Sequence, residues 1–178
     1  VQRPDRHDVP VIVVNQGHNG ERQRFTLAHE LAHLVLRFSG LSDAEQEKAA
    51  DRFAGAFLMA KDMVLQLLGP HRTSISIGEL AELKKLFKVS IASLVVRCSQ
   101  LGIIPKAVYG RLWAQIKDLG WNSQASGEPG TLKAEVPQRM ERLCFRAVAE
   151  SAISEARAAE LLSISVRELD RRLMGQFA

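Results

Sequence analysis

The chain has 178 residues, of which 46% are hydrophobic and 25% charged, and its formal net charge at pH 7 is +4. These are the proportions of an ordinary globular protein, so they argue against intrinsic disorder, and the small positive excess does not by itself indicate nucleic-acid binding. No apolar run approaches the roughly 20 residues of a membrane-spanning helix, and we expect a cytoplasmic protein without a membrane partner. Cys98 and Cys144 are predicted to be buried thiols of a reducing compartment rather than a disulfide.

The first regular element is predicted at residues 9–15, where the sequence VPVIVVN is short and β-branched. This composition favours a strand, and Pro10 suits the first residue of a strand or an exposed edge. A turn-rich loop follows at 16–20. Because the sequence begins with Val1 and a strand follows almost at once, we expect it to start inside a longer protein.

A helix is predicted from residue 21 to residue 39, which contain no Gly or Pro, with Gly40 placed to end it. This segment holds the pattern H-E-x-x-H. Its two histidines, His29 and His33, are four residues apart, so on a helix they share one face and can both point a ring nitrogen at one metal ion. Glu30 lies beside that face, where it can reach a water molecule at the metal without being a ligand.

A third ligand is needed, because a catalytic zinc site takes three protein ligands and an open fourth position. Ser42 and Glu45 form a plausible capping box for a second helix that runs to about residue 60, which occupies Glu45. Glu47 and Asp51 share the next face of that helix. In this E-x-x-A-D arrangement Glu47 is predicted to ligate zinc, and Asp51 to hydrogen-bond the far nitrogen of a ligand histidine.

The chemistry that this donor set predicts is metal-assisted peptide hydrolysis, with Glu30 as the general base that later returns its proton to the leaving amine. The strand over 11–14 is a natural edge for an extended substrate peptide to pair with. The competing interpretation is a chance H-E-x-x-H with ordinary histidines. Far fewer chance occurrences would also present E-x-x-A-D on a following helix.

The rest of the chain is predicted to be helical. Apolar spacing indicates helices over 76–88, 90–101, 105–119, 140–148 and 155–162, and a last helix that contains Leu169 and Leu173. The fold class expected is therefore α+β and predominantly α, a zincin-like helix pair with a small β element. The predicted division is a metallopeptidase domain at 1–68, a helical region packed on it at 69–121, a linker at 122–136 and a helix-turn-helix-like region at 137–178.

Residues 20–60 resemble the ImmA/IrrE family of zinc metallopeptidases. The matching residues are ERQRFTLAHELAH at 21–33, then Glu47, Ala50, Asp51, Phe53, Ala54, Leu58 and Met59. Softer matches continue at 80–85, 89–91, 101–104, 119–121, 142–143 and 158–162, and they look like the helical part of members that carry an upstream helix-turn-helix domain. The chain departs from the family pattern at Ala32, Arg37 and Ala60, none of which is a predicted ligand.

The resemblance implies an intracellular protease that cleaves or controls a helix-turn-helix repressor of the Xre type. The expected setting is a stress response, mobile-element excision or a toxin–antitoxin pair. By the same resemblance His29, His33 and Glu47 would hold Zn²⁺ and Glu30 would be the base. DNA would be contacted only indirectly, or through a fused or partner domain.

The alternative is a catalytically silent regulator that binds DNA or a repressor partner through its helical half, with a structural zinc site. Residues 153–173 and 77–98 have helix-turn-helix proportions, and Arg167, Arg171 and Arg172 could meet phosphates. Both segments are also compatible with plain packed helical hairpins, the interpretation that we favour because the basic excess is slight. His71 and Tyr109 are candidates for an oxyanion donor that the sequence cannot place.

Overall fold

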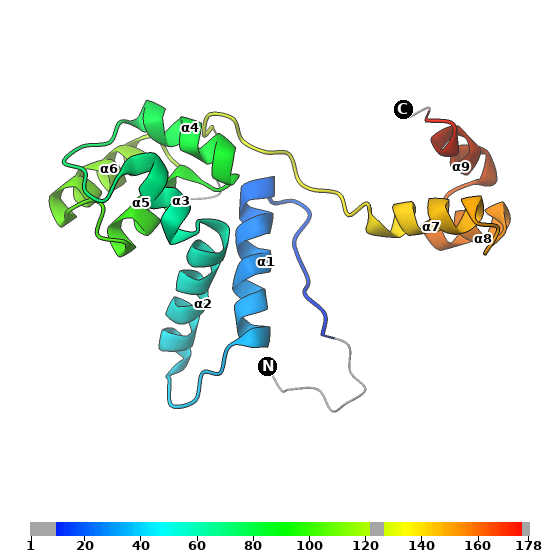
Figure 1. Ribbon diagram of the computed structural model, residues 1–178, viewed down its shortest axis with the longest axis horizontal. Coiled ribbons are helices and arrows are strands. Elements are labelled where there is room, and N and C mark those ends of the chain that lie inside the picture. The colour runs from blue at the N-terminus through cyan, green and yellow to red at the C-terminus, as the bar shows by residue number, and fades with distance from the viewer. Residues whose placement is uncertain (1–9, 122–126, 176–178) are drawn as a thin grey trace. The chain divides into compact units, whose positions relative to one another are not determined.

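The structure is a computed structural model that describes residues 10–121 and 127–175. It divides into two compact units, which we call unit 1 (residues 1–135) and unit 2 (residues 136–178). Within the described ranges all regular secondary structure is helical, which confirms the prediction of a mostly α chain (Figure 1). None of these helices combines the length and the apolar character that crossing a bilayer requires.

Unit 1 begins with two helices that lie side by side, α1 (Gly20–Val35) and α2 (Asp43–Leu58), as Figure 1 shows. Four alanines are buried on these two helices, and such small side chains let two backbones approach closely. They are Ala28 and Ala32 on α1, and Ala50 and Ala54 on α2. The close approach fixes how the polar residues beside these alanines face one another.

The ends of the two helices follow from local capping. The Asn19 side chain accepts the Arg22 N–H at 2.9 Å at the start of α1, and the predicted capping box of Ser42 and Glu45 is present at the start of α2. The first helix ends at Val35, four residues before the predicted end. The chain leaves the helix there, and the Phe38 ring lies against His33 with ring centroids 5.4 Å apart.

The remaining helices of unit 1 are α3 (Lys61–Leu68), α4 (Ile77–Phe87), α5 (Ile91–Gln100) and α6 (Lys106–Asp118). They enclose the main hydrophobic core, to which the sequence-predicted apolar positions of α4 to α6 contribute. Its fully buried members include Met59, Val64, Leu80, Ile91, Leu94, Val95, Cys98, Ile103 and Ile116. The helix α3 was not distinguished in the sequence, because a break at Met59 and Ala60 carries neither Gly nor Pro.

The predicted small β element is wrong for the residues described. Residues 10–15 form no strand, although Val11 and Val13 are exposed and Ile12 and Val14 half-buried, as expected for a half-buried strand. A strand needs a neighbouring strand to pair with, and no other described segment provides one. The hypothesis of a substrate-pairing edge therefore has no sheet behind it in this structure.

Residues 127–135 of the predicted linker (122–136) pack against the rest of unit 1. Residues 127–135 lie against the start of α1: Gly20 N–H donates to the Leu132 carbonyl at 3.0 Å, and Glu135 N–H donates to Gln23 Oε1 at 2.9 Å. Residues 122–126 lie outside the described residues. We call the ordered stretch 127–135 the strap. The other predicted domain boundaries stay predictions.

Unit 2 contains α7 (Arg139–Ala149), α8 (Glu155–Leu162) and α9 (Val166–Leu173), which pack around a small core of Cys144, Ala158, Ala159 and Leu169. A three-residue turn joins α8 to α9, and its first residue, Ser163, is left-handed with φ 54°. The basic side chains of α9 are largely neutralised. Arg171 and Arg172 both pair with Glu168, which offsets part of their positive charge, while no ion pair of Arg167 is present among the described residues.

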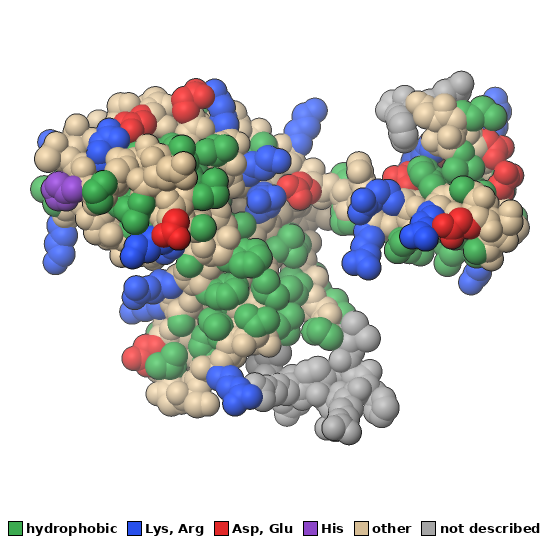
Figure 2. Space-filling view, in the orientation of Figure 1, with side chains coloured by type: hydrophobic (Ala, Val, Ile, Leu, Met, Phe, Trp, Pro, Cys, Tyr) green, Lys and Arg blue, Asp and Glu red, His purple; other side chains and the backbone are tan. Residues whose placement is uncertain are grey.

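The helix pair of unit 1 exposes a group of apolar side chains. Leu27, Leu34 and Val35 of α1 and Phe57 of α2 are all exposed, and Figure 2 shows hydrophobic side chains gathered over this helix pair. Exposed apolar surface of this kind often marks a contact surface for another molecule.

Candidate metal centre

The two histidines of H-E-x-x-H stand one turn apart on α1 and point at the same place. Their side chains are each 16% exposed, and their Nε2 atoms lie 3.2 Å apart. Two ring nitrogens that face each other this closely need a proton or a cation between them. The helix thus presents two nitrogen donors, His29 and His33, toward one point.

The third donor comes from α2. Glu47 Oε2 lies 3.2 Å from His29 Nε2, and Glu47 Oε1 lies 3.3 Å from His33 Nε2. Zinc binds nitrogen and carboxylate oxygen at about 2.0–2.1 Å in a tetrahedron, whose edges are then about 3.3 Å long. The two separations from Glu47 start at different oxygens of its carboxylate, and one donor atom from each of the three residues lies within 4.8 Å of the other two, which is close enough for all three to hold one ion. No other group of three His, Cys, Asp or Glu that could hold a metal is present among the described residues.

Asp51, one turn beyond Glu47, contacts the far side of the first histidine. Its Oδ1 lies 2.9 Å from His29 Nδ1. A carboxylate at this distance holds the ring proton on Nδ1, which leaves Nε2 with a free lone pair directed at His33 and Glu47.

The neighbouring acidic residues have different surroundings. Glu45 accepts the N–H and the O–H of Ser42, at 2.9 and 2.6 Å, and the side-chain hydrogen bond lowers the pKa of Glu45. The Glu45 carboxylate is therefore hydrogen-bonded within the capping box, as expected. Glu30 is half-buried on α1, and among the described residues it forms no hydrogen bond or ion pair. It lies next to His29 in the sequence, and no described residue pairs with its carboxylate.

Neither candidate for an oxyanion donor joins this cluster. His71 is exposed in the loop before α4. Tyr109 stacks on Trp113 with ring centroids 5.7 Å apart and packs against the main core. Both therefore have structural surroundings of their own, away from the donor atoms of α1 and α2.

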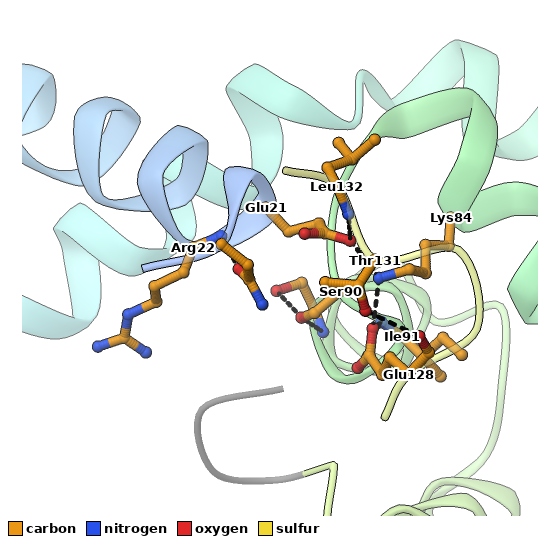
Figure 3. Close-up of polar contacts among 10 residues, drawn as sticks. Glu21, Arg22, Lys84, Ser90, Ile91, Glu128, Thr131 and Leu132 are labelled. Atoms are coloured by element: carbon orange, nitrogen blue, oxygen red, sulfur yellow. Dashed lines mark hydrogen bonds and ion pairs between the residues drawn. The ribbon is translucent and has the colours of Figure 1, made fainter. Parts of the chain in front are cut away.

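A second polar cluster, which the sequence did not predict, lies at the other end of α1 (Figure 3). The Lys84 ammonium of α4 is buried between two carboxylates, those of Glu21 at the start of α1 and Glu128 on the strap. The Glu128 carboxylate also accepts the Ile91 N–H at 3.3 Å, and Glu21 Oε1 accepts the Leu132 N–H at 3.0 Å. These contacts connect α1, α4, α5 and the strap, so they hold α1 in place. No local pattern could reveal them, since the three charges are separated by dozens of residues.

Comparison with known proteins finds related sequences. The family described as the IrrE N-terminal-like domain matches residues 2–99, more than half of the chain. The radiation response metalloprotease IrrE of Deinococcus radiodurans is 31% identical over 108 residues, which cover 53% of this chain and 32% of that protein. The protein of the same description from Deinococcus deserti is 37% identical over 94 residues, which cover 44% of this chain and 32% of the relative.

The matched region thus spans about a third of the length of these curated relatives. No solved structure matches the chain. Because the family match includes both helices that supply the donor atoms and covers more than half of the sequence, the chain belongs to the family of IrrE N-terminal-like domains, a metalloprotease family.

Proposed function

We propose that this chain is a zinc-dependent endopeptidase that hydrolyses a peptide bond of a protein substrate. The observation that carries the proposal is the convergence of His29 Nε2, His33 Nε2 and the Glu47 carboxylate, whose nearest atoms are 3.2–3.3 Å apart, with Glu30 next to His29 in the sequence. A metalloprotease family implies a divalent metal, and two imidazoles with one carboxylate are a donor set that catalytic zinc uses.

Bound to these three side chains, a zinc ion would polarise the scissile carbonyl and lower the pKa of a water molecule. The protein supplies the rest. Asp51 orients His29 through Nδ1, and the packed alanines of α1 and α2 keep Glu47 opposite the histidines. The fixed positions of the donors remove the cost of reorganising them during the reaction.

Glu30 is the proton carrier in this proposal. Its carboxylate accepts a proton from the attacking water as the new C–O bond forms. The same proton then passes to the nitrogen of the leaving amine as the C–N bond breaks, so the enzyme ends each cycle unchanged. A carboxylate without a partner among the described residues is available for both transfers.

The substrate we propose is a helix-turn-helix repressor of the Xre type, cleaved in the cytoplasm as part of a stress response, mobile-element excision or a toxin–antitoxin system. The names of the two relatives, radiation response metalloproteases, support a protein substrate and a stress setting. The exposed apolar side chains of α1 and α2 offer a surface for an apolar substrate segment.

The alternative, a silent regulator that binds DNA through its helical half, draws less support from the charges. Two of the three arginines of α9 that were its best evidence, Arg171 and Arg172, are paired with Glu168. A regulator that binds a repressor without cleaving it stays open, and Glu30 distinguishes it from the peptidase.

The test is Glu30→Gln, with Glu155→Gln, an exposed glutamate of α8, as the matched control. The purified chain should contain about one zinc per molecule in all three forms. Cleavage of a co-produced Xre-type repressor should fall by roughly 10²–10⁴-fold in the Glu30 variant alone, the usual loss on removing a general base. Equal repressor control by the Glu30 variant, with zinc retained, would refute the peptidase and favour the silent regulator.

A further inference from the structure

A cavity of about 520 Å³ opens in unit 1 where the start of α1 meets the second half of α2. The described residues that line it come from these two helices, from α5 and α6, from the loop before α1 and from the strap. Ligand pockets commonly measure about 300–1,000 Å³, so the cavity can hold a large side chain of another molecule. The three metal donors do not line it, but Asp51, which contacts the His29 ring, does.

The cavity continues the faces of α1 and α2 that carry the metal donors. On α1, Phe25 of the lining stands four residues before His29, and residues four apart on a helix share a face. On α2, Gly55 of the lining stands four residues after Asp51, which in turn stands four residues after Glu47. The two helices run antiparallel (Figure 1), so Phe25 and Gly55 lie at the same level, one turn beyond the contact of His29 with Asp51.

This spacing matches the reach of a bound peptide. One turn of an α-helix rises about 5.4 Å, and an extended peptide advances about 3.3 Å per residue. A peptide that lies over the metal donors and runs along the helix pair therefore brings a side chain to the cavity one or two residues from the bond at the metal.

The lining favours an apolar side chain with a flat ring. Phe25, Trp113 and Trp121 are half-buried and line the cavity, and both tryptophans pack against the main hydrophobic core, which holds them in place. Aromatic rings gain from stacking edge-to-face or offset on one another, beyond the gain from burying their area. Three aromatic residues around one cavity therefore suit an aromatic occupant.

The charged residues of the lining do not call for a charged occupant. Acidic side chains and arginines are equal in number there, namely Glu21, Arg22, Asp51 and Arg97. Each of the two carboxylates already has a partner, one the Lys84 ammonium and the other the His29 ring. The Arg97 Nε donates to the Met59 carbonyl at 3.0 Å. The formal charges of these four residues cancel, and a neutral side chain meets no net charge.

Gly55 keeps space open on the α2 side of the cavity. Glycine inside a helix is unfavourable relative to alanine, because it loses more backbone freedom on folding. A Cβ at Gly55 would lie 3.8 Å from Gln100 Oε1 and 4.0 Å from Arg97 Cδ, and both of those residues line the cavity. A single methyl group fits there, whereas a larger side chain would extend among residues of the lining.

We propose that this cavity is the specificity pocket of the peptidase, and that it receives a large apolar side chain of the substrate, preferably an aromatic one, one or two residues from the scissile bond. That the occupant belongs to a substrate rests on the proposed function. The preference of the cavity for an aromatic side chain rests only on its lining.

The first test measures binding without cleavage, because the chain has only two tryptophans and both line the cavity. The probe is N-acetylphenylalanine methylamide, and N-acetylalanine methylamide is the same backbone with a small side chain. Tryptophan fluorescence of the full chain should change saturably with the phenylalanine probe, which should bind at least about tenfold more tightly than the alanine probe. No saturable change, or equal binding of the two probes, would overturn the proposal.

A variant then locates the site. Gly55→Leu should abolish binding of the phenylalanine probe, because the new side chain occupies part of the cavity. Gly110→Leu is the matched control, since Gly110 is exposed on α6 and a Cβ there meets nothing within 4 Å. Both variants should keep the circular dichroism spectrum of the unaltered chain. Full binding by a folded Gly55→Leu chain would place the site elsewhere.

Cleavage separates this proposal from the proposed function. Gly55→Leu should lower kcat/KM for a co-purified repressor by roughly tenfold or more with its zinc content unchanged, and Gly110→Leu should not. Equal cleavage by the Gly55 variant and the unaltered chain would refute the pocket while the peptidase stands. If the unaltered chain binds the phenylalanine probe tightly and cleaves no repressor, the peptidase is refuted and the aromatic preference of the cavity stands.

Discussion

The two ends of α1 carry two clusters of charged and polar side chains that differ in exposure. At the metal end the Glu47 and Asp51 side chains are 61% and 60% exposed. At the other end the side chains of Glu21, Lys84 and Glu128 are 1% exposed or less. In the first cluster the carboxylates face histidine rings, and in the second they face the Lys84 ammonium.

The difference is where the positive charge comes from. The buried cluster contains its own cation, Lys84, so it closes on itself when the chain folds and holds four segments together. The donors of the open cluster face one another without a lysine or arginine among their described partners, so the metal ion that we propose there would come from solvent. The comparison teaches that one helix can be anchored at one end by a charge-paired buried cluster and present unpaired donor atoms for a ligand at the other.

The largest effect is expected when the internal cation of the buried cluster, Lys84, is removed. Lys84→Met should lower the free energy of unfolding of unit 1 by about 3–5 kcal/mol, because two buried carboxylates would be left without a counter-charge. Urea unfolding followed by tryptophan fluorescence measures this, since Trp113 and Trp121 both belong to unit 1. Lys85→Met is the control. That side chain is 57% exposed, and its loss should cost within about 0.5 kcal/mol. Equal midpoints for the two variants would show that the buried cluster does not anchor α1.

A smaller effect is expected where the strap crosses the start of α1. Gly20→Ala should destabilise unit 1 by about 1–3 kcal/mol, because its Cβ would lie 2.6 Å from the Lys133 carbonyl oxygen and the strap would have to move. Gly110→Ala in α6 is the matched control. A Cβ there meets nothing within 4 Å, so the change should stabilise the helix by up to about 1 kcal/mol. Stabilisation by both substitutions would mean that the strap is not held against α1.

At the open end the corresponding change is Asp51→Asn. It removes the carboxylate that fixes the His29 ring, and such losses lower metal affinity by roughly 10- to 100-fold. We expect the loss of affinity to be near tenfold, since the Asp51 side chain is mostly exposed and solvent screens its negative charge. Competition with a zinc chelator measures the affinity. His33→Ala, which removes a donor atom itself, should abolish stoichiometric binding, and an equal effect of the two variants would contradict the distinct roles proposed for them.

The open cluster was predictable from sequence because helical periodicity creates it. His29 and His33 are four apart, Glu47 and Asp51 are four apart, and the alanines between them indicate a close helix pair. Only the pairing of the two helices had to be inferred. The tautomer-fixing contact between Asp51 and His29 was also anticipated, since it follows from the same spacing.

The closed cluster was not predictable in this way. Glu128 lies in a stretch rich in Gly, Pro and Ser that looks like a linker, and its burial depends on Lys84, 44 residues away. The predicted strand over 9–15 does not form in its described residues, 10–15, for a related reason. Its β-branched residues favour an extended backbone, but a strand forms only where a partner from elsewhere in the chain pairs with it.

The smallest effect expected concerns the cap that starts α2 and thereby positions Glu47. The hydrogen bond from the Ser42 side chain lowers the pKa of Glu45 from its usual 4.5. A carboxyl whose pKa is lower in the folded state stabilises the fold above its unfolded pKa, and that contribution is lost as the pH falls through the folded value. Ser42→Ala should therefore destabilise the fold more at neutral pH than well below pH 4, where only the loss of the backbone cap remains, as read from urea unfolding at a series of pH values. Asp43→Asn provides the comparison, since it changes a first-turn charge without touching the capping box. A loss in the Ser42 variant that does not depend on pH would show that its hydroxyl acts on the backbone alone and not through Glu45.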